Sequence, residues 1–101
     1  MRNFKDFPVI SRYTLGQAIM DGVLTRITVF QGKPVVATSH ILEHIGKDDL
    51  LEIFHEFSEW DLYTRPKLPE EDQLFHMEWN GRKVWVIESD ESYTLMYPED
   101  Y

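Results

Sequence analysis

The dipeptide Asn80-Gly81 is the feature of this sequence that most restricts how the chain can fold. Asparagine and glycine both accept the positive φ angles that a two-residue type I′ turn requires. The flanking segments, QLFHMEW and RKVWVIE, are rich in aromatic and β-branched residues. The pattern therefore predicts a β-hairpin with a tight turn at residues 80–81.

A two-residue turn also fixes the register of the hairpin, beginning with Trp79 opposite Arg82. One face of the hairpin is then apolar and should belong to the core. Its facing pairs are Met77 with Val84 and Phe75 with Val86. The reverse face pairs Glu78 with Lys83, His76 with Trp85 and Leu74 with Ile87.

The residues after the hairpin predict a third strand. The segment SDES resembles a second turn, and YTLMYPEDY follows it. A tight turn would place Leu95 beside Val86 and Tyr97 beside Val84 in the core, with Met96 on the reverse face. The predicted unit is a three-stranded antiparallel meander. Because its reverse face is also partly apolar, we expect helices, N-terminal strands or a partner to cover it.

The N-terminal half contains short elements with clear boundaries. Thr14 and Gln17 form a capping box, Asp21-Gly22 ends the helix, and Tyr13 is spaced for a staple contact with Ala18. We expect Leu15 and Ile19 to form the buried edge of this helix. Strands are predicted at residues 23–30 and 35–38 around the turn QGKP, followed by a short helix at residues 39–46.

KDDLLEIFHEFSEW carries the longest helical pattern, with apolar residues at a period of 3.6. Asp48 or Asp49 is the expected N-cap, and Asp49 with Glu52 fits a capping box. The prolines and acids of YTRPKLPEEDQ, residues 63–73, predict a loop. Together these patterns predict one α+β domain over residues 1–101, in which the meander packs with two or three helices.

Composition limits the chemistry. The chain has no cysteine, which excludes disulfides, thiolate zinc sites and a cysteine nucleophile. No apolar run approaches the roughly 18 residues of a membrane span, and the first residues do not resemble a signal peptide. We expect a soluble, cytoplasmic protein. No phosphate-binding glycine loop or nucleophile elbow occurs, so we expect no cofactor and no enzymatic activity.

The charge is unevenly distributed along the chain. Residues 47–101 carry five Lys and Arg against fifteen Asp and Glu, a net charge of −10. Such a surface disfavours direct binding of DNA or RNA and favours a partner with a basic surface. The alternative is that the acidity serves solubility alone.

Three short blocks carry a family resemblance. They are YTLGQAIMDGVL, PVVAT and TLMYPEDY, which share Tyr-Thr, Gln-Ala and Asp-Gly-Val-Leu, then Pro-Val-x-x-Thr, then a terminus of the form T-x-M-x-P-E-D. With these blocks the chain resembles the small proteins of bacteria and mobile elements grouped as domain of unknown function 6573. The segment LLEIFHEFSEWDLYTRP matches only approximately. The resemblance implies a shared fold unit and a mobile-element setting, and it implies no activity.

The histidines carry the alternative hypothesis. His40 and His44 are spaced i, i+4 on a predicted helix, a spacing that can hold a metal ion if a third ligand such as His55 approaches. A metal-binding protein or small enzyme is therefore the second reading of this sequence.

Our leading interpretation is a non-enzymatic domain that binds a protein. Aromatic residues are common at interfaces, and acids attract basic partners. In the mobile-element setting, such a surface would imitate nucleic acid and block a host defence or DNA-binding enzyme. The expected contact residues are Glu52, Glu56, Glu59, Tyr63, Glu70, Glu71, Asp72 and Trp85. The oligomeric state is open: an edge at residues 92–101 would allow strand pairing, although Pro98 opposes a long pairing.

Overall fold

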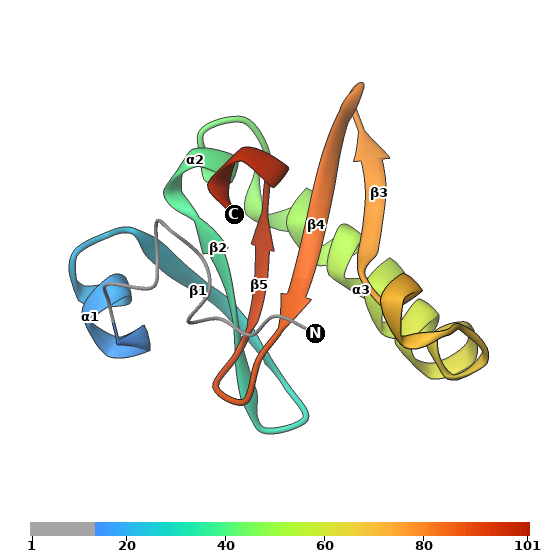
Figure 1. Cartoon of the computed structure of the whole chain (residues 1–101). Helices are drawn as coiled ribbons and strands as arrows, with labels where there is room; N and C mark the ends of the chain where they lie inside the picture. The colour runs from blue at the N-terminus through green and yellow to red at the C-terminus, as the bar shows by residue number, and fades with distance from the viewer. Residues whose placement is uncertain (1–13) are drawn as a thin grey trace.

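The computed structural model describes residues 14–101, which form an α+β fold around one mixed sheet of five strands (Figure 1). The α+β class predicted from the sequence is confirmed. The elements, in chain order, are α1 (Leu15–Met20), β1 (Leu24–Phe30), β2 (Lys33–Thr38), α2 (Ser39–Leu42), α3 (Lys47–Tyr63), β3 (Phe75–Trp79), β4 (Arg82–Glu88) and β5 (Tyr93–Met96). Short 3₁₀ turns, η2 (Arg65–Lys67), η3 (Glu70–Asp72) and η4 (Pro98–Asp100), lie in the connections.

The strands follow the order β1-β2-β5-β4-β3. Neighbouring strands are antiparallel except for β2 and β5, which are parallel. The three C-terminal strands are thus part of a larger sheet. β5 lies between β2 and β4, so the prediction of an exposed edge at residues 92–101 was wrong for the strand in that segment. Its four residues are all buried, as expected of a central strand.

The turn at Asn80-Gly81 has the predicted conformation, with φ of 53° at Asn80 and 82° at Gly81. The predicted register of β3 with β4 is confirmed from Trp79–Arg82 to Phe75–Val86. β5 pairs Leu95 with Val86, which also follows the prediction. The local turn chemistry therefore determines which side chains reach the core.

Replacing Gly81 by alanine should lower the free energy of unfolding by about 1 kcal/mol, because a Cβ atom is strained at positive φ. No atom outside residues 80–82 lies within 4 Å of the position that this Cβ would take, so the cost comes from the backbone alone. Gly16→Ala is the control, since Gly16 lies in α1 without a positive φ and its Cβ position is equally open. Urea denaturation measures both. An equal effect of the two variants would contradict this account of the turn.

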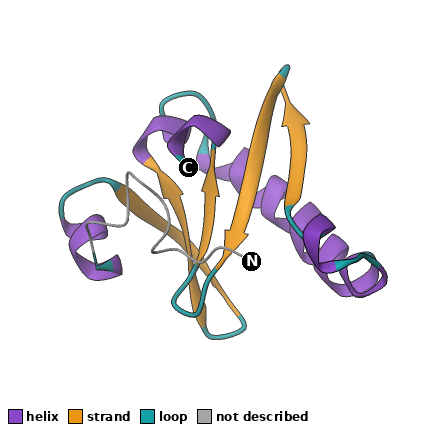
Figure 2. Cartoon of the chain, in the orientation of Figure 1, coloured by secondary structure: helices purple, strands orange, loops and turns teal. Residues whose placement is uncertain are grey.

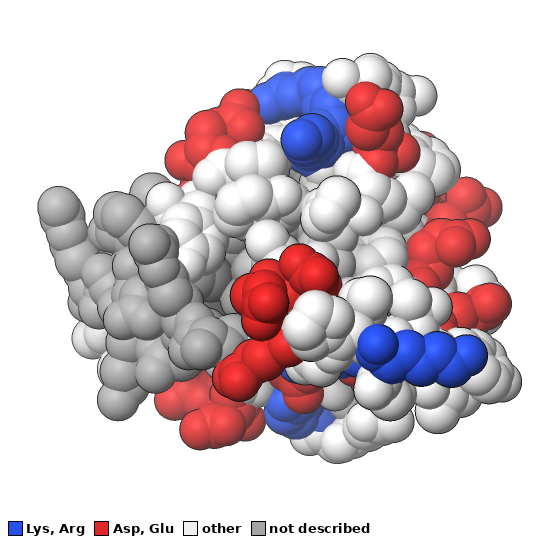
Figure 3. Space-filling view, turned by 45° about the vertical axis from the view of Figure 1, so that its right-hand side comes forward, with Lys and Arg blue, Asp and Glu red and all other residues white. Residues whose placement is uncertain are grey.

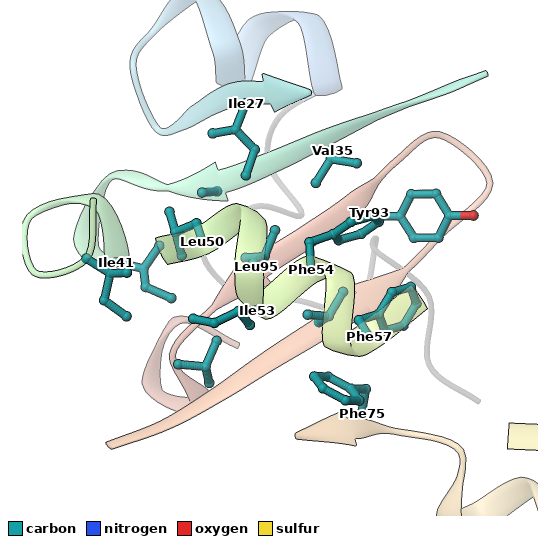
Figure 4. Packing of buried hydrophobic residues seen from close by; sticks show 14 of the residues in the cluster. Ile27, Val35, Ile41, Leu50, Ile53, Phe54, Phe57, Phe75, Tyr93 and Leu95 are labelled. Atoms are coloured by element: carbon teal, nitrogen blue, oxygen red, sulfur yellow. The ribbon is translucent and has the colours of Figure 1, made fainter. Parts of the chain in front are cut away.

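Helix α3 covers one face of the sheet (Figures 2 and 4). Its side chains Leu50, Ile53, Phe54 and Phe57 are at most 5% exposed and pack against the sheet. The helix begins after Gly46 and continues to Tyr63. The prediction that Asp48 or Asp49 is the N-cap of this helix was wrong, because Gly46 occupies that position.

Both aspartates lie in the first turn instead, where they still favour the helix dipole. Gly46 occupies the N-cap position without a side-chain hydrogen bond. The predicted loop at residues 63–73 is largely ordered as η2 and η3. Prolines stand at the first helical turn of η2 and at the N-cap of η3, positions where their missing N–H costs nothing.

A smaller cluster lies on the opposite face. Its buried members are Ala18, Leu24, Val36, Ile87 and Met96, and half-buried Trp85 and Tyr101 pack against them. Helix α1 contributes Ala18, which is fully buried, whereas the predicted edge residues Leu15 and Ile19 are only half-buried.

The start and end of α1 follow the prediction. The Thr14–Gln17 capping box is present, and Gly22 takes a φ of 78° after the helix. The predicted staple with Tyr13 lies outside the described residues. No helix within residues 14–101 is both long enough and apolar enough to cross a membrane.

Candidate binding groove

A groove of about 620 Å³ opens beside the end of β4 that β3 does not reach. The ladder between these strands ends at Phe75 and Val86, and the turns η2 and η3 pass alongside. The groove is therefore bounded by the 65–74 connection, by β4 and by Tyr101. Its described lining consists of Phe57, Arg65, Glu70, Glu71, Gln73, Leu74, Trp85, Val86, Ile87, Glu88 and Tyr101.

Two residues of the groove wall, Arg65 and Glu88, belong to a network of charged side chains. Nη1 of Arg65 donates to Oδ1 of Asp61 at 2.8 Å and to Oε1 of Glu88 at 2.7 Å. Nζ of Lys33 donates to the other oxygen of Glu88 at 3.2 Å and to the carbonyl of Ser89 at 2.7 Å. This network joins α3, β2 and β4 to the 65–74 connection.

The surroundings of these groups shift their pKa values. Burial alone would raise the pKa of Glu88, but hydrogen bonds from Arg65 and Lys33 and the two positive charges hold it below its ordinary value. Burial would likewise lower the pKa of Arg65, and its bonds to Glu88 and Asp61 outweigh that effect and raise it. Burial raises the pKa of Tyr93, with the charge of Glu88 adding to the rise. At neutral pH, Glu88 is a carboxylate and Tyr93 is a neutral phenol.

Aromatic side chains form the apolar part of the groove. The rings of Trp85 and Tyr101 meet edge to face, with centroids 5.4 Å apart. The chain before Tyr101 is held by Asp100, whose carboxylate accepts from Thr38 Oγ1 at 2.9 Å and lies 2.9 Å from Nδ1 of His40. The position of Tyr101 beside the sheet is thus set by bonds from β2 and α2.

The connection itself is folded around Gln73. Its amide donates to the carbonyl oxygens of Arg65 at 3.2 Å and Leu68 at 3.0 Å. These two bonds tie the residue after η3 back to η2 and to the residue that follows η2. Glu70 and Glu71 therefore lie on an ordered turn. A pre-formed turn loses less conformational entropy on binding than a flexible loop does.

The groove brings together only part of the predicted contact set. Glu70, Glu71 and Trp85 line it. Asp72 is exposed in η3 and lies outside the lining, and Tyr63 is 65% exposed at the end of α3. The remaining predicted residues, Glu52, Glu56 and Glu59, lie on the exposed side of α3. On the face drawn in Figure 3, acidic side chains appear in separate groups, with uncharged and basic side chains between them.

The three histidines of the metal hypothesis have other neighbours. Nδ1 of His40 lies against Asp100, Nδ1 of His44 lies 3.1 Å from the carbonyl oxygen of His40, and Nε2 of His55 lies 2.7 Å from Glu59. The rings of His40 and His44 pack edge to face on each other and on Tyr97. Within residues 14–101, no three His, Cys, Asp or Glu side chains gather as metal ligands would.

Sequence reasoning missed four polar or aromatic residues of the site: Arg65, Gln73, Glu88 and Tyr101. Arg65 carried a usable signal, because it follows Asp61 at i, i+4 at the end of a helix, a spacing typical of an ion pair. Glu88 carried none, since its bond to Arg65 depends on how β4 lies beside the 65–74 connection.

Comparison of the chain with protein-family models, with curated proteins and with solved structures returns no match. The resemblance to domain of unknown function 6573 stays a prediction.

Proposed function

We propose that this chain is a non-enzymatic protein-binding domain and that its groove receives an apolar side chain of a partner segment next to Lys or Arg. The observation that carries the proposal is the pairing of an aromatic wall, Trp85 and Tyr101, with an acidic turn, Glu70 and Glu71, around one groove. Concave sites of this kind bind ligands through apolar contact and take their specificity from a few polar groups.

The charge of the groove favours a basic segment. Among residues 14–101, its lining contains one Arg and three Glu, a net charge of −2. Arg65 is committed to Asp61 and Glu88, so it offers no unpaired positive charge to a ligand. Lys or Arg in the partner would be attracted to this net negative charge.

The ionisation of Glu88 supports binding over acid–base catalysis. A general acid or base works best when its pKa lies near the operating pH. The pKa of Glu88 is held below its ordinary value, further from neutrality, by Arg65 and Lys33. In this arrangement the carboxylate is suited to holding the wall of the groove in place.

Imitation of nucleic acid is the second form of the proposal, and the observation that favours it is the stripe of Glu52, Glu56 and Glu59 on α3. These residues are spaced to lie along one side of the helix, and all three are exposed. Glu59 already pairs with His55. A host enzyme bound in this way would contact the stripe, and its binding would weaken steeply with salt.

Selection from a random peptide library separates the two forms. We expect enriched peptides to carry an aromatic or aliphatic residue beside Lys or Arg. The double variant Glu70→Gln/Glu71→Gln should bind them about fivefold more weakly. Glu52→Gln/Glu56→Gln removes the same charge from α3 and should bind as the unmodified protein does.

Two outcomes would contradict the groove as the site. One is enrichment of acidic or purely polar peptides. The other is that the α3 variant loses binding while the groove variant binds as the unmodified protein does. That result would favour the stripe on α3 as the site. Circular dichroism spectra of both variants check that the fold is retained.

A further inference from the structure

The sheet formed by residues 14–101 ends in two edge strands, β1 and β3 (Figure 1). Their pairings with the neighbouring strands differ in regularity. The pairing of β1 with β2 shifts register between Arg26 and Thr28, which marks a bulge. The pairing of β3 with β4 is unbroken over its five residues. A bulge twists an edge away from further pairing, whereas a regular edge presents its backbone groups to another strand.

The hairpin geometry shows which backbone groups of β3 point outward. Trp79 and Arg82 flank a two-residue turn, so they exchange hydrogen bonds, and so do Met77 and Val84 two positions on. The N–H and C=O groups of His76 and Glu78 then face away from β4. Across residues 14–101, no strand other than β4 pairs with β3.

We propose that a second copy of this chain pairs with β3 in antiparallel orientation, about a two-fold axis at Met77. In this register, His76 of each copy lies opposite Glu78 of the other copy. The outward backbone groups of these residues are then aligned for hydrogen bonds between the copies. On the face toward α3 it places Phe75 opposite Trp79 of the second copy. A histidine ring can donate a hydrogen bond to a facing carboxylate, and aromatic pairs are favourable cross-strand neighbours.

The neighbouring registers are less favourable, which argues for a unique pairing. A shift by two residues in one direction sets His76 opposite His76 of the second copy. The opposite shift sets Glu78 opposite Glu78, where like charges repel. Only the register with its axis at Met77 pairs all five residues of the strand. Because β1 is bulged, the pairing stops at a closed dimer.

A single cysteine tests the proposed axis directly. The chain contains no cysteine. Met77 is a non-hydrogen-bonded position of the proposed ladder, where facing Cα atoms lie about 4.5 Å apart, within reach of a disulfide. Met77→Cys should therefore form a covalent dimer under mild oxidation.

Val29→Cys is the control for Met77→Cys. Val29 lies on β1 and is 54% exposed, so random collisions would cross-link it faster than the half-buried position 77. Faster dimer formation by Met77→Cys supports the pairing. Equal or slower formation, measured by non-reducing electrophoresis, would overturn it.

Sedimentation equilibrium tests the same pairing without a cross-link. The unmodified protein should show a monomer–dimer equilibrium. His76→Glu sets two like-charged pairs across the axis and should weaken the dimer about tenfold, whereas His76→Lys should not weaken it. Thr25→Glu adds a charge to the β1 edge and serves as the control. A monomer at all concentrations, or equal weakening by His76→Glu and Thr25→Glu, would overturn the proposal.

Discussion

Replacing Phe57 by alanine should lower the free energy of unfolding by about 4 kcal/mol, the largest loss that we expect from one substitution in this chain. Phe57 is 1% exposed and lies where α3 meets the sheet. Its ring centroid is 5.6 Å from that of Phe75 on β3 and 5.6 Å from that of Tyr93 on β5. Truncation would leave a cavity between the helix and two strands, and it would remove these edge-to-face contacts.

Phe57 also lines the groove, so its loss should affect the site. The substitution would open the apolar floor toward the core, and peptides selected on the groove should bind less tightly. Leu62→Ala is the matched control, because Leu62 lies on the same helix and is 65% exposed; its loss should stay within about 0.5 kcal/mol. Chemical denaturation measures both variants. A loss below about 1 kcal/mol for Phe57→Ala would show that the aromatic cluster is not the centre of the core.

Local patterns predicted the hairpin well because its turn and its alternation are properties of adjacent residues. The parallel pair of β2 and β5 was not predicted, since it joins segments whose contact depends on the whole chain between them. Both strands nevertheless carried a signal. VVAT and YTLM are short runs with little polarity, and such runs are typical of strands buried on both faces.

The candidate site divides in the same way. Glu70, Glu71 and Trp85 were predicted from charge and aromatic content, and the structure places them around one groove. The stripe of acidic residues on α3 was predicted as part of the same contact surface, but it lies outside the groove lining. The hydrogen bond between Arg65 and Glu88 joins residues that are 23 positions apart in the chain. Arg65 lies in η2, within the segment that its prolines had predicted to be a loop. Composition could identify the acidic turn, but it could not identify Glu88 as the half-buried partner of Arg65.

Replacing Arg65 by alanine should lower the free energy of unfolding at neutral pH by about 2 to 3 kcal/mol. The Arg65 side chain is 18% exposed, and its loss would leave Asp61 and Glu88 partly buried without their shared donor. Lys33 would still contact Glu88, which limits the loss. Lys67→Ala removes the same charge from an exposed position in η2 and should change stability little.

The dependence of this loss on pH follows from the pKa of Glu88. The ordinary value is 4.5, and the folded protein holds it lower. A carboxylate with a lowered pKa stabilises the fold above the pKa of the unfolded chain, and that contribution is lost as the pH falls through the folded value. Arg65 causes part of the lowering, so the difference between Arg65→Ala and the unmodified protein should be largest above about pH 5 and shrink below about pH 4. Urea denaturation across this pH range measures the difference in the free energy of unfolding. If the difference stays constant down to acid pH, Arg65 stabilises the fold through packing against Trp60 and not through Glu88.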